Sequence, residues 1–197
     1  ETIRLNTPRE VGDAQGIAYS LVAPAKLTGE GATAVHFREL AGLLLTSAIL
    51  YVCYARPRKS LAGVWDFLTQ QHATFAEALT TMANTAHPAI RSMVRALQNI
   101  TGDRELSGVW TTAIRPLILY SDPLVAASTD TSTLSFEALQ HAAQPLSLYL
   151  IAPSPMELDR LHPLYRVILD VAWTRLMERK VRTWRWRLLN CCDELPW

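Results

Sequence analysis

The longest apolar stretch of the chain lies at residues 41–55 and reads AGLLLTSAILYVCYA. Its fifteen residues fall short of the roughly 18–20 that a helix needs to cross a bilayer. Thr46 and Ser47 interrupt it with hydroxyl groups, and charged residues flank it on both sides. We therefore expect a helix buried in the core of a soluble protein, with any membrane anchor of the whole protein outside this chain.

Helix signals surround this stretch throughout residues 1–144. Thr7-Pro8-Arg9-Glu10 and Thr74-Phe75-Ala76-Glu77 fit capping boxes, in which a Thr at the N-cap is followed three residues later by Glu. A helix is predicted from about Arg104 to Tyr120, kinked at Pro116. Residues 1–144 are therefore predicted to form an all-α domain, a helical bundle.

The pattern changes in residues 145–197. Residues 146–151 (LSLYLI) and 184–192 have the short apolar or alternating pattern of strands. A helix is predicted between them from Ser154 to about Arg179, beginning with a third capping box at Ser154-Pro155-Met156-Glu157. Strand, helix and strand make a βαβ unit, which implies a parallel sheet. Two strands cannot form a stable sheet alone, so the other strands are expected from sequence outside this chain.

Composition argues against a disordered tail, a coiled-coil rod and a disulfide-rich protein. Hydrophobic residues make up 49% of the 197 residues, which supports a sizeable core, and the net charge is only +1. Residues 1–145 carry eleven Lys or Arg and twelve Asp or Glu, a balance of −1, so no overall field attracts nucleic acid. The three cysteines, two of them adjacent, cannot build a disulfide framework, which favours a reducing compartment.

One acidic pair is a candidate for catalysis. Asp193-Glu194 follows an apolar predicted strand, as in P-loop ATPases, where Asp orients Mg²⁺ and Glu activates water. Strands also end in acidic residues simply because the next loop is solvated. The chain contains no G-x-x-x-x-G-K-[ST] phosphate loop, so this chain alone is not expected to hydrolyse ATP.

Two groups of basic residues are candidates for binding a partner. Arg56, Arg58 and Lys59 form a basic turn, and Arg91 and Arg95 share one face of a predicted helix. Basic groups of this kind are more often ordinary solvated patches than binding sites.

Eight stretches in order along the chain resemble the type IV secretion coupling proteins, the TraG/TraD/VirD-type conjugative DNA-transfer ATPases. They lie at residues 1–15, 43–52, 59–64, 107–113, 120–126, 145–153, 158–164 and 193–196, the last being Asp193-Glu194-Leu195-Pro196. Together they span almost the whole chain. The chain departs from the family pattern at Asn190-Cys191-Cys192, where plain aliphatic residues are usual.

The resemblance implies an all-α domain inserted into a RecA-like P-loop motor. Residues 1–144 would be that domain and residues 145–197 a partial α/β motor segment ending at the Walker B strand. The parent would be a hexameric ATPase using ATP and Mg²⁺, anchored in the bacterial inner membrane with this part on the cytoplasmic face. In that parent Asp193 would hold Mg²⁺ and Glu194 would activate water, whereas the fragment itself is expected to bind no cofactor.

The family's all-α domain is implicated in receiving cargo, either a relaxase–DNA complex or a protein effector. The candidate cargo-binding residues would be Arg56, Arg58, Lys59, Arg91 and Arg95. Two alternatives stay open, a free-standing helical DNA-binding protein and a structural module that contacts other components of the secretion ring.

Overall fold

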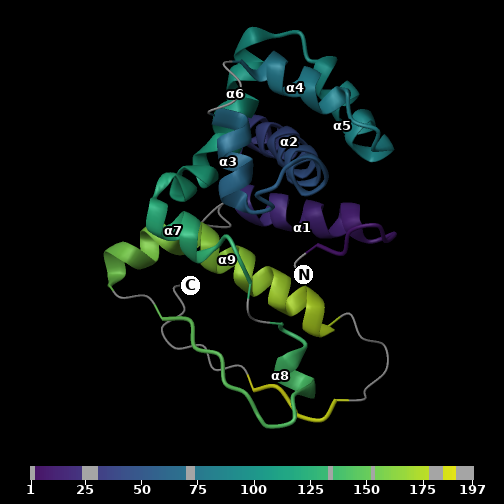
Figure 1. Cartoon of the computed structure of the whole chain (residues 1–197). Helices are drawn as coiled ribbons and strands as arrows, with labels where there is room; N and C mark the ends of the chain where they lie inside the picture. Colours follow the sequence, from purple (N-terminus) through teal and green to yellow (C-terminus); the bar gives the residue numbers. More distant parts are fainter. Residues whose placement is uncertain are drawn as a thin grey trace.

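The computed structural model describes residues 3–23, 31–69, 74–132, 135–151, 154–177 and 184–189, and these are mainly helical (Figure 1). The elements are α1 (Glu10–Val22), α2 (Ala32–Ala55), α3 (Leu61–Thr69), α4 (Phe75–Ala83), α5 (Pro88–Gln98), α6 (Asp103–Ile114), the 3₁₀ helix η1 (Arg115–Ser121), α7 (Pro123–Ser128), α8 (Ala138–His141) and α9 (Pro155–Met177). The predicted all-α architecture is confirmed for the described part of the first 144 residues.

Helix α2 is the centre of the bundle, as its apolar sequence predicts. Helices α1, α3, α5 and α6 pack around it, and Leu44, Leu45 and Leu50 are fully buried. By length and composition alone α2 could also cross a membrane. However, 56% of its most apolar 18-residue stretch is buried inside the protein. Its burial supports the interpretation as a core helix.

The N-cap hydrogen bond of two of the three predicted capping boxes is present. Thr74 accepts a hydrogen bond from the Glu77 N–H (3.2 Å), and Ser154 accepts one from the Glu157 N–H (3.2 Å). The box predicted at Thr7 is wrong, because α1 begins at Glu10 with Arg9 as its N-cap. The Glu10 carboxylate is engaged by groups from three other segments, described below.

Pro116 divides the predicted helix, as expected. Helix α6 ends at Ile114 and the chain continues as the 3₁₀ helix η1. Proline has no N–H to donate to the carbonyl one turn earlier and its ring crowds that carbonyl, so an α-helix cannot continue regularly through it.

The predicted strands are not found in the described residues. Residues 146–151 are irregular, and residues 184–189 instead donate the Arg185 and Trp186 N–H groups to the Gln140 carbonyl of α8 (both 3.1 Å). The predicted parallel alignment of 146–151 with 188–192 is therefore wrong wherever these residues are described; 190–192 lie outside that part. The physical reason is that two strands without neighbours cannot sustain a sheet.

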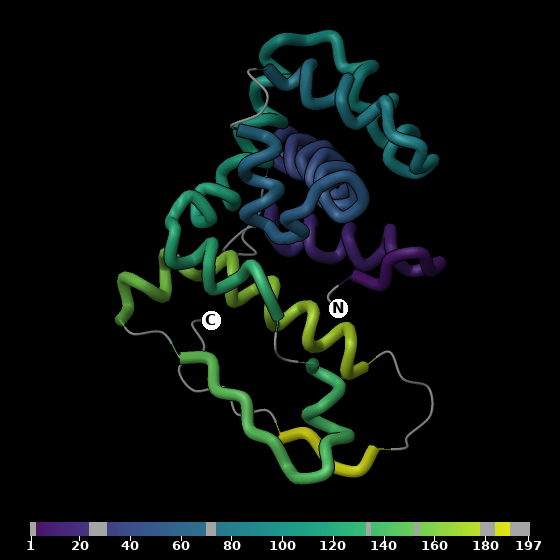
Figure 2. The backbone as a smooth tube through the Cα atoms, viewed as in Figure 1, coloured from purple at the N-terminus to yellow at the C-terminus, as the bar shows by residue number. Residues whose placement is uncertain are grey.

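The tube in Figure 2 shows where these segments lie. Residues 146–151 and 184–189 occupy the end of the view opposite to α4 and α5, beyond α9. Helix α9 packs along α1, so the helix predicted between the two strands is present while the sheet is not.

Candidate functional site

Arg56, at the end of α2, is used in packing. Its guanidinium lies over the rings of Tyr51 (5.7 Å) and Phe67 (5.4 Å), at distances typical of cation–π contacts. Its Nε is buried and has no hydrogen-bond partner among the described residues. The side chain therefore stabilises the junction of α2 and α3 and is poorly placed to meet a partner.

Arg58 is neutralised within the chain. Its Nε donates to Asp130 Oδ1 (2.6 Å) and its Nη1 to Asp66 Oδ2 (3.2 Å). The hydrogen bond to Asp130 raises the pKa of Arg58 further, and the same bond lowers the pKa of Asp130. Lys59 is exposed at the rim of a cavity, so the basic turn presents one uncommitted cation where the sequence has three.

Arg91 and Arg95 have a different environment. Both are exposed on α5, one helical turn apart, and neither makes an ion pair with a described residue. The opposite face of α5 buries Ile90, Val94 and Leu97. No Asp or Glu occurs between Ala78 and Gly102, so the outer face of α5 carries positive charge only.

The structure does not combine the two basic groups into one site. Arg56 and Arg58 are committed to neighbours, and Arg91 and Arg95 stand on a separate helix. The proposed catalytic pair, Asp193 and Glu194, lies outside the described residues. The described part of the chain contains no group of three or more His, Cys, Asp or Glu side chains that could hold a metal ion.

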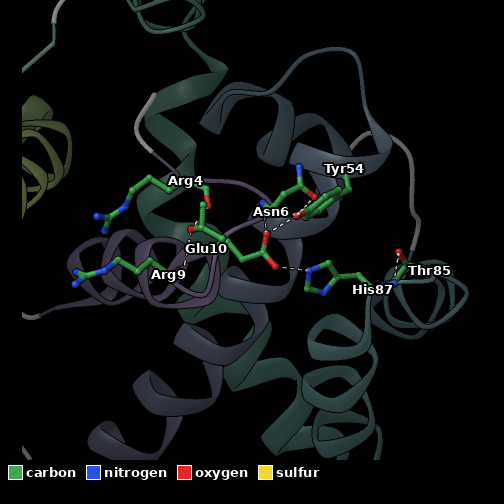
Figure 3. Close-up of polar contacts among 8 residues, drawn as sticks. Arg4, Asn6, Arg9, Glu10, Tyr54, Thr85 and His87 are labelled. Atoms are coloured by element: carbon green, nitrogen blue, oxygen red, sulfur yellow. Dashed lines mark hydrogen bonds and ion pairs between the residues drawn. The ribbon is translucent and has the colours of Figure 1, made fainter.

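A polar cluster of Asn6, Glu10, Tyr54 and His87 was not predicted (Figure 3). Glu10 Oε1 lies 2.9 Å from His87 Nε2, Glu10 Oε2 accepts a hydrogen bond from the Tyr54 hydroxyl, and the Asn6 N–H donates to the same oxygen (2.8 Å). The rings of Tyr54 and His87 are in contact with centroids 4.9 Å apart and are tilted by 42° relative to each other. The hydrogen bond from Tyr54 is the main cause of a lowered pKa at Glu10.

This cluster joins the start of α1, the end of α2 and the start of α5. Glu10 and His87 expose only 15% and 14% of their side chains. The capping-box pattern singled out Glu10, but partners 44 and 77 residues away could not be found from spacing. The cluster is a structural junction that fixes how α5, and with it Arg91 and Arg95, is presented.

A cavity of about 540 Å³ lies among the helices and residues 148–150. Most of its lining is apolar, and Cys53, Lys59 and Tyr120 contribute polar groups. Burial raises the pKa of both Cys53 and Tyr120, so the thiol and the phenol stay protonated at neutral pH. A protonated, half-buried thiol is a poor nucleophile, and the cavity offers no catalytic group of this kind.

Comparison with known proteins shows the family. The family described as "Type IV secretory system Conjugative DNA transfer" matches residues 1–191. Two proteins of Escherichia coli, both called conjugal transfer protein TraG, are 31% and 30% identical to the chain over 213 residues. Each alignment covers 100% of this chain but only 32% and 33% of the relative, so the chain spans about a third of the length of these relatives.

No solved structure matches the chain. The resemblance noted in the sequence is thus confirmed by the family match over residues 1–191, even though residues 146–151 and 184–189 do not form the expected strands. The chain belongs to the type IV secretory system conjugative DNA transfer family.

Proposed function

We propose that this chain supplies the cargo-receiving helical domain of a type IV secretion coupling ATPase, and that the outer face of α5 is where cargo docks. The family match supports a role in conjugative DNA transfer. The cargo would be a relaxase–DNA complex or a secreted effector protein, in contact with other components of the secretion machinery.

The observation that carries this proposal is the contrast between Arg58 and the pair Arg91 and Arg95. Arg58 satisfies two carboxylates of its own chain, at 2.6 and 3.2 Å. Arg91 and Arg95 are exposed on a helix without acidic residues and have no ion pair with a described residue. An arginine left free in this way can bind a carboxylate or phosphate through two parallel hydrogen bonds.

The orientation of α5 is fixed, which favours a docking role. Its buried face packs on α2, and its first turn is held by the His87–Glu10 contact (2.9 Å) and the tilted ring contact between His87 and Tyr54. The two guanidinium groups are therefore carried on a rigid helix. Rigid presentation reduces the entropy lost when a partner binds.

We place the chemistry of transport in a longer parent. ATP and Mg²⁺ would act there, with Asp193 as the Mg²⁺ residue and Glu194 as the water-activating residue. This chain contains no G-x-x-x-x-G-K-[ST] phosphate loop, so ATP hydrolysis is proposed for the parent and not for this chain alone. The parent would be hexameric and anchored in the inner membrane, with this domain on the cytoplasmic side.

The test is a charge reversal on α5, R91E/R95E, in the purified chain. Binding of the relaxase–DNA complex from the same conjugative system is followed by fluorescence anisotropy. Loss of two charge-assisted contacts is expected to weaken binding by about tenfold or more. The matched control is R104E/R115E, which makes the same change of charge at exposed arginines of α6 and η1.

The same assay separates the alternatives. Equal binding by wild type and R91E/R95E, with both folded by circular dichroism, would contradict the docking role and favour a structural module, whose variants would change oligomerisation instead. A free-standing DNA-binding protein would bind DNA alone, with affinity falling steeply as salt rises. We expect weak DNA binding, because only two free arginines lie on α5 and the net charge is +1.

A further inference from the structure

Three polar contacts cross the interface between α1 and α9 in an antiparallel series. From one end to the other, Arg175 meets Asp13, Asp170 meets Ser20, and Arg166 meets the Ala23 carbonyl. We call this series the polar seam. We infer that the polar seam is a latch that holds α9 on the helical body and can open while the rest of the bundle stays folded.

The strongest contact of the polar seam is a set of three charges, of which Asp13 and Arg175 are nearly buried while Arg4 is 29% exposed. Asp13 accepts from Arg4 Nε (2.8 Å), Arg4 Nη2 (2.5 Å) and Arg175 Nη2 (3.2 Å). Only 7% of the Asp13 side chain and 11% of the Arg175 side chain are exposed. Burial raises the pKa of Asp13, but the hydrogen bonds from Arg4 and the charge of Arg175 outweigh it, and the net result is a lowered pKa.

The other two contacts continue the polar seam along both helices. The Ser20 hydroxyl donates to Asp170 Oδ2 (2.6 Å), and Arg166 Nη1 donates to the Ala23 carbonyl at the end of α1 (2.9 Å). The Ala23 carbonyl lies just beyond the last turn of α1, where carbonyls have no partner within the helix. Arg166 therefore caps α1 from the neighbouring helix.

Apolar packing between α1 and α9 leaves part of their interface open. Of the 23 residues of α9, Val167 and Leu176 are buried, and Leu161, Leu164 and Val171 pack partly buried against the core. A groove of about 610 Å³ follows the interface, and Gly12 and Gly16 line it without any side chain to fill it. The attachment of α9 therefore combines this partial apolar packing with the charge-assisted contacts of the polar seam.

The role of the latch follows from its position between two parts of the chain, and it rests on the proposed function. Helix α9 belongs to residues 145–197, which are expected to continue into the motor, and α1 belongs to the cargo-receiving bundle. A displacement of the motor segment would then reach the bundle through the polar seam. Asp13, Ser20 and Arg175 are positioning residues in this scheme and need not touch cargo.

Hydrogen exchange of the purified chain, followed by mass spectrometry without cargo, tests the latch. In the wild type, amides of α9 are expected to exchange by local opening, with protection well below that of α2. The variant R175M removes the α9 partner but leaves Asp13 paired with Arg4. It is expected to lower protection in α9 by about tenfold, with α2 unchanged.

The control R104M makes the same substitution at an exposed arginine of α6 and should leave α9 unchanged. The milder variant S20A should lower protection of α9 in the same direction, and it serves if R175M does not fold. Equal protection of α9 and α2 in the wild type, or equal loss in both helices in the variant, would overturn the latch. Because no cargo is present, this outcome is independent of the R91E/R95E binding result.

Discussion

The helical body around α2 and the C-terminal segments use similar residues with opposite results. Leu44, Leu45 and Leu50 in α2 are fully buried. In residues 146–151 the exposed fractions are 48% for Leu146, 77% for Tyr149 and 74% for Ile151. Apolar character alone therefore does not decide burial in this chain; the presence of a packing partner does.

The difference follows from how each element satisfies its backbone. A helix closes its hydrogen bonds within itself, so α2 forms and then needs only side-chain neighbours, which α1, α3, α5 and α6 supply. A strand needs a neighbouring strand for its N–H and C=O groups. The described residues of 145–197 offer none, so these apolar side chains remain exposed.

The largest expected effect is a contrast between two leucine deletions. Leu45→Ala opens a cavity in the core and should lower the free energy of unfolding by about 3–5 kcal/mol. Leu189→Ala, at a residue that is 83% exposed, should change it by less than about 0.5 kcal/mol. Urea denaturation followed by circular dichroism measures both, and equal losses would contradict the division into a packed body and an unpartnered segment.

Two glycine-to-alanine changes sharpen the same contrast within helices. A Cβ at Gly63 would lie 2.2 Å from the Arg58 carbonyl oxygen, so Gly63→Ala should force the α2–α3 turn apart and cost about 1–3 kcal/mol. A Cβ at Gly16, in the middle of α1, meets nothing within 4 Å.

Gly16→Ala should therefore stabilise the chain by about 0.5–1 kcal/mol, because alanine loses less backbone entropy in a helix. The two midpoints in urea should move in opposite directions from that of the wild type. A stabilising Gly63→Ala would show that the close approach of α3 to the preceding turn is not required.

Local signals in the sequence predicted local structure well. The apolar run around Leu45, the caps at Thr74 and Ser154, and the break at Pro116 depend on residues within one or two turns, and all four are present. The strand at 146–151 was wrong because a strand depends on partners that no local pattern contains.

The pairing of charged residues could not be predicted from the sequence for a related reason. Arg58 finds its carboxylates 8 and 72 residues away, and Asp13 and Arg175 are separated by 162 residues. The sequence identified the basic residues, but it could not show which of them pair with carboxylates in the folded chain. The distinction between Arg58 and the free arginines of α5 is therefore a product of the tertiary structure.

The junction at Glu10 gives a smaller, pH-dependent effect. Its hydrogen bond from Tyr54 holds the pKa of Glu10 below its ordinary value of 4.5. A lowered pKa in the folded state means that this stabilisation is present above about pH 4.5 and is lost as pH falls through the folded value. Tyr54→Phe should cost about 1 kcal/mol at pH 7.

The pH profile is the decisive measurement for this junction. Below the folded pKa of Glu10 the cost of Tyr54→Phe should shrink. The protonated carboxyl of Glu10 binds the Tyr54 hydroxyl less strongly than the carboxylate does, so the substitution then removes a weaker hydrogen bond. Thermal unfolding between pH 3 and pH 7 compares the two proteins. A cost that stays constant over this range would mean that Tyr54 acts by packing against His87 and not through Glu10.

The smallest expected effect concerns the ion pair that distinguishes Arg58 from the arginines of α5. Asp130→Asn removes the carboxylate 2.6 Å from Arg58 Nε, at a site where both side chains are 38% exposed. Because solvent and salt screen such a pair, the midpoint in urea should shift less than for Tyr54→Phe, and the shift should vanish at high salt. The stronger consequence should be electrostatic, since Arg58 would then face one carboxylate, that of Asp66 at 3.2 Å, in place of two. If pairing with its own carboxylates keeps Arg58 from binding cargo, Asp130→Asn should strengthen cargo binding in the anisotropy assay. An unchanged affinity would show that the position of the α2–α3 turn, and not the pairing of Arg58, keeps Arg58 from binding cargo.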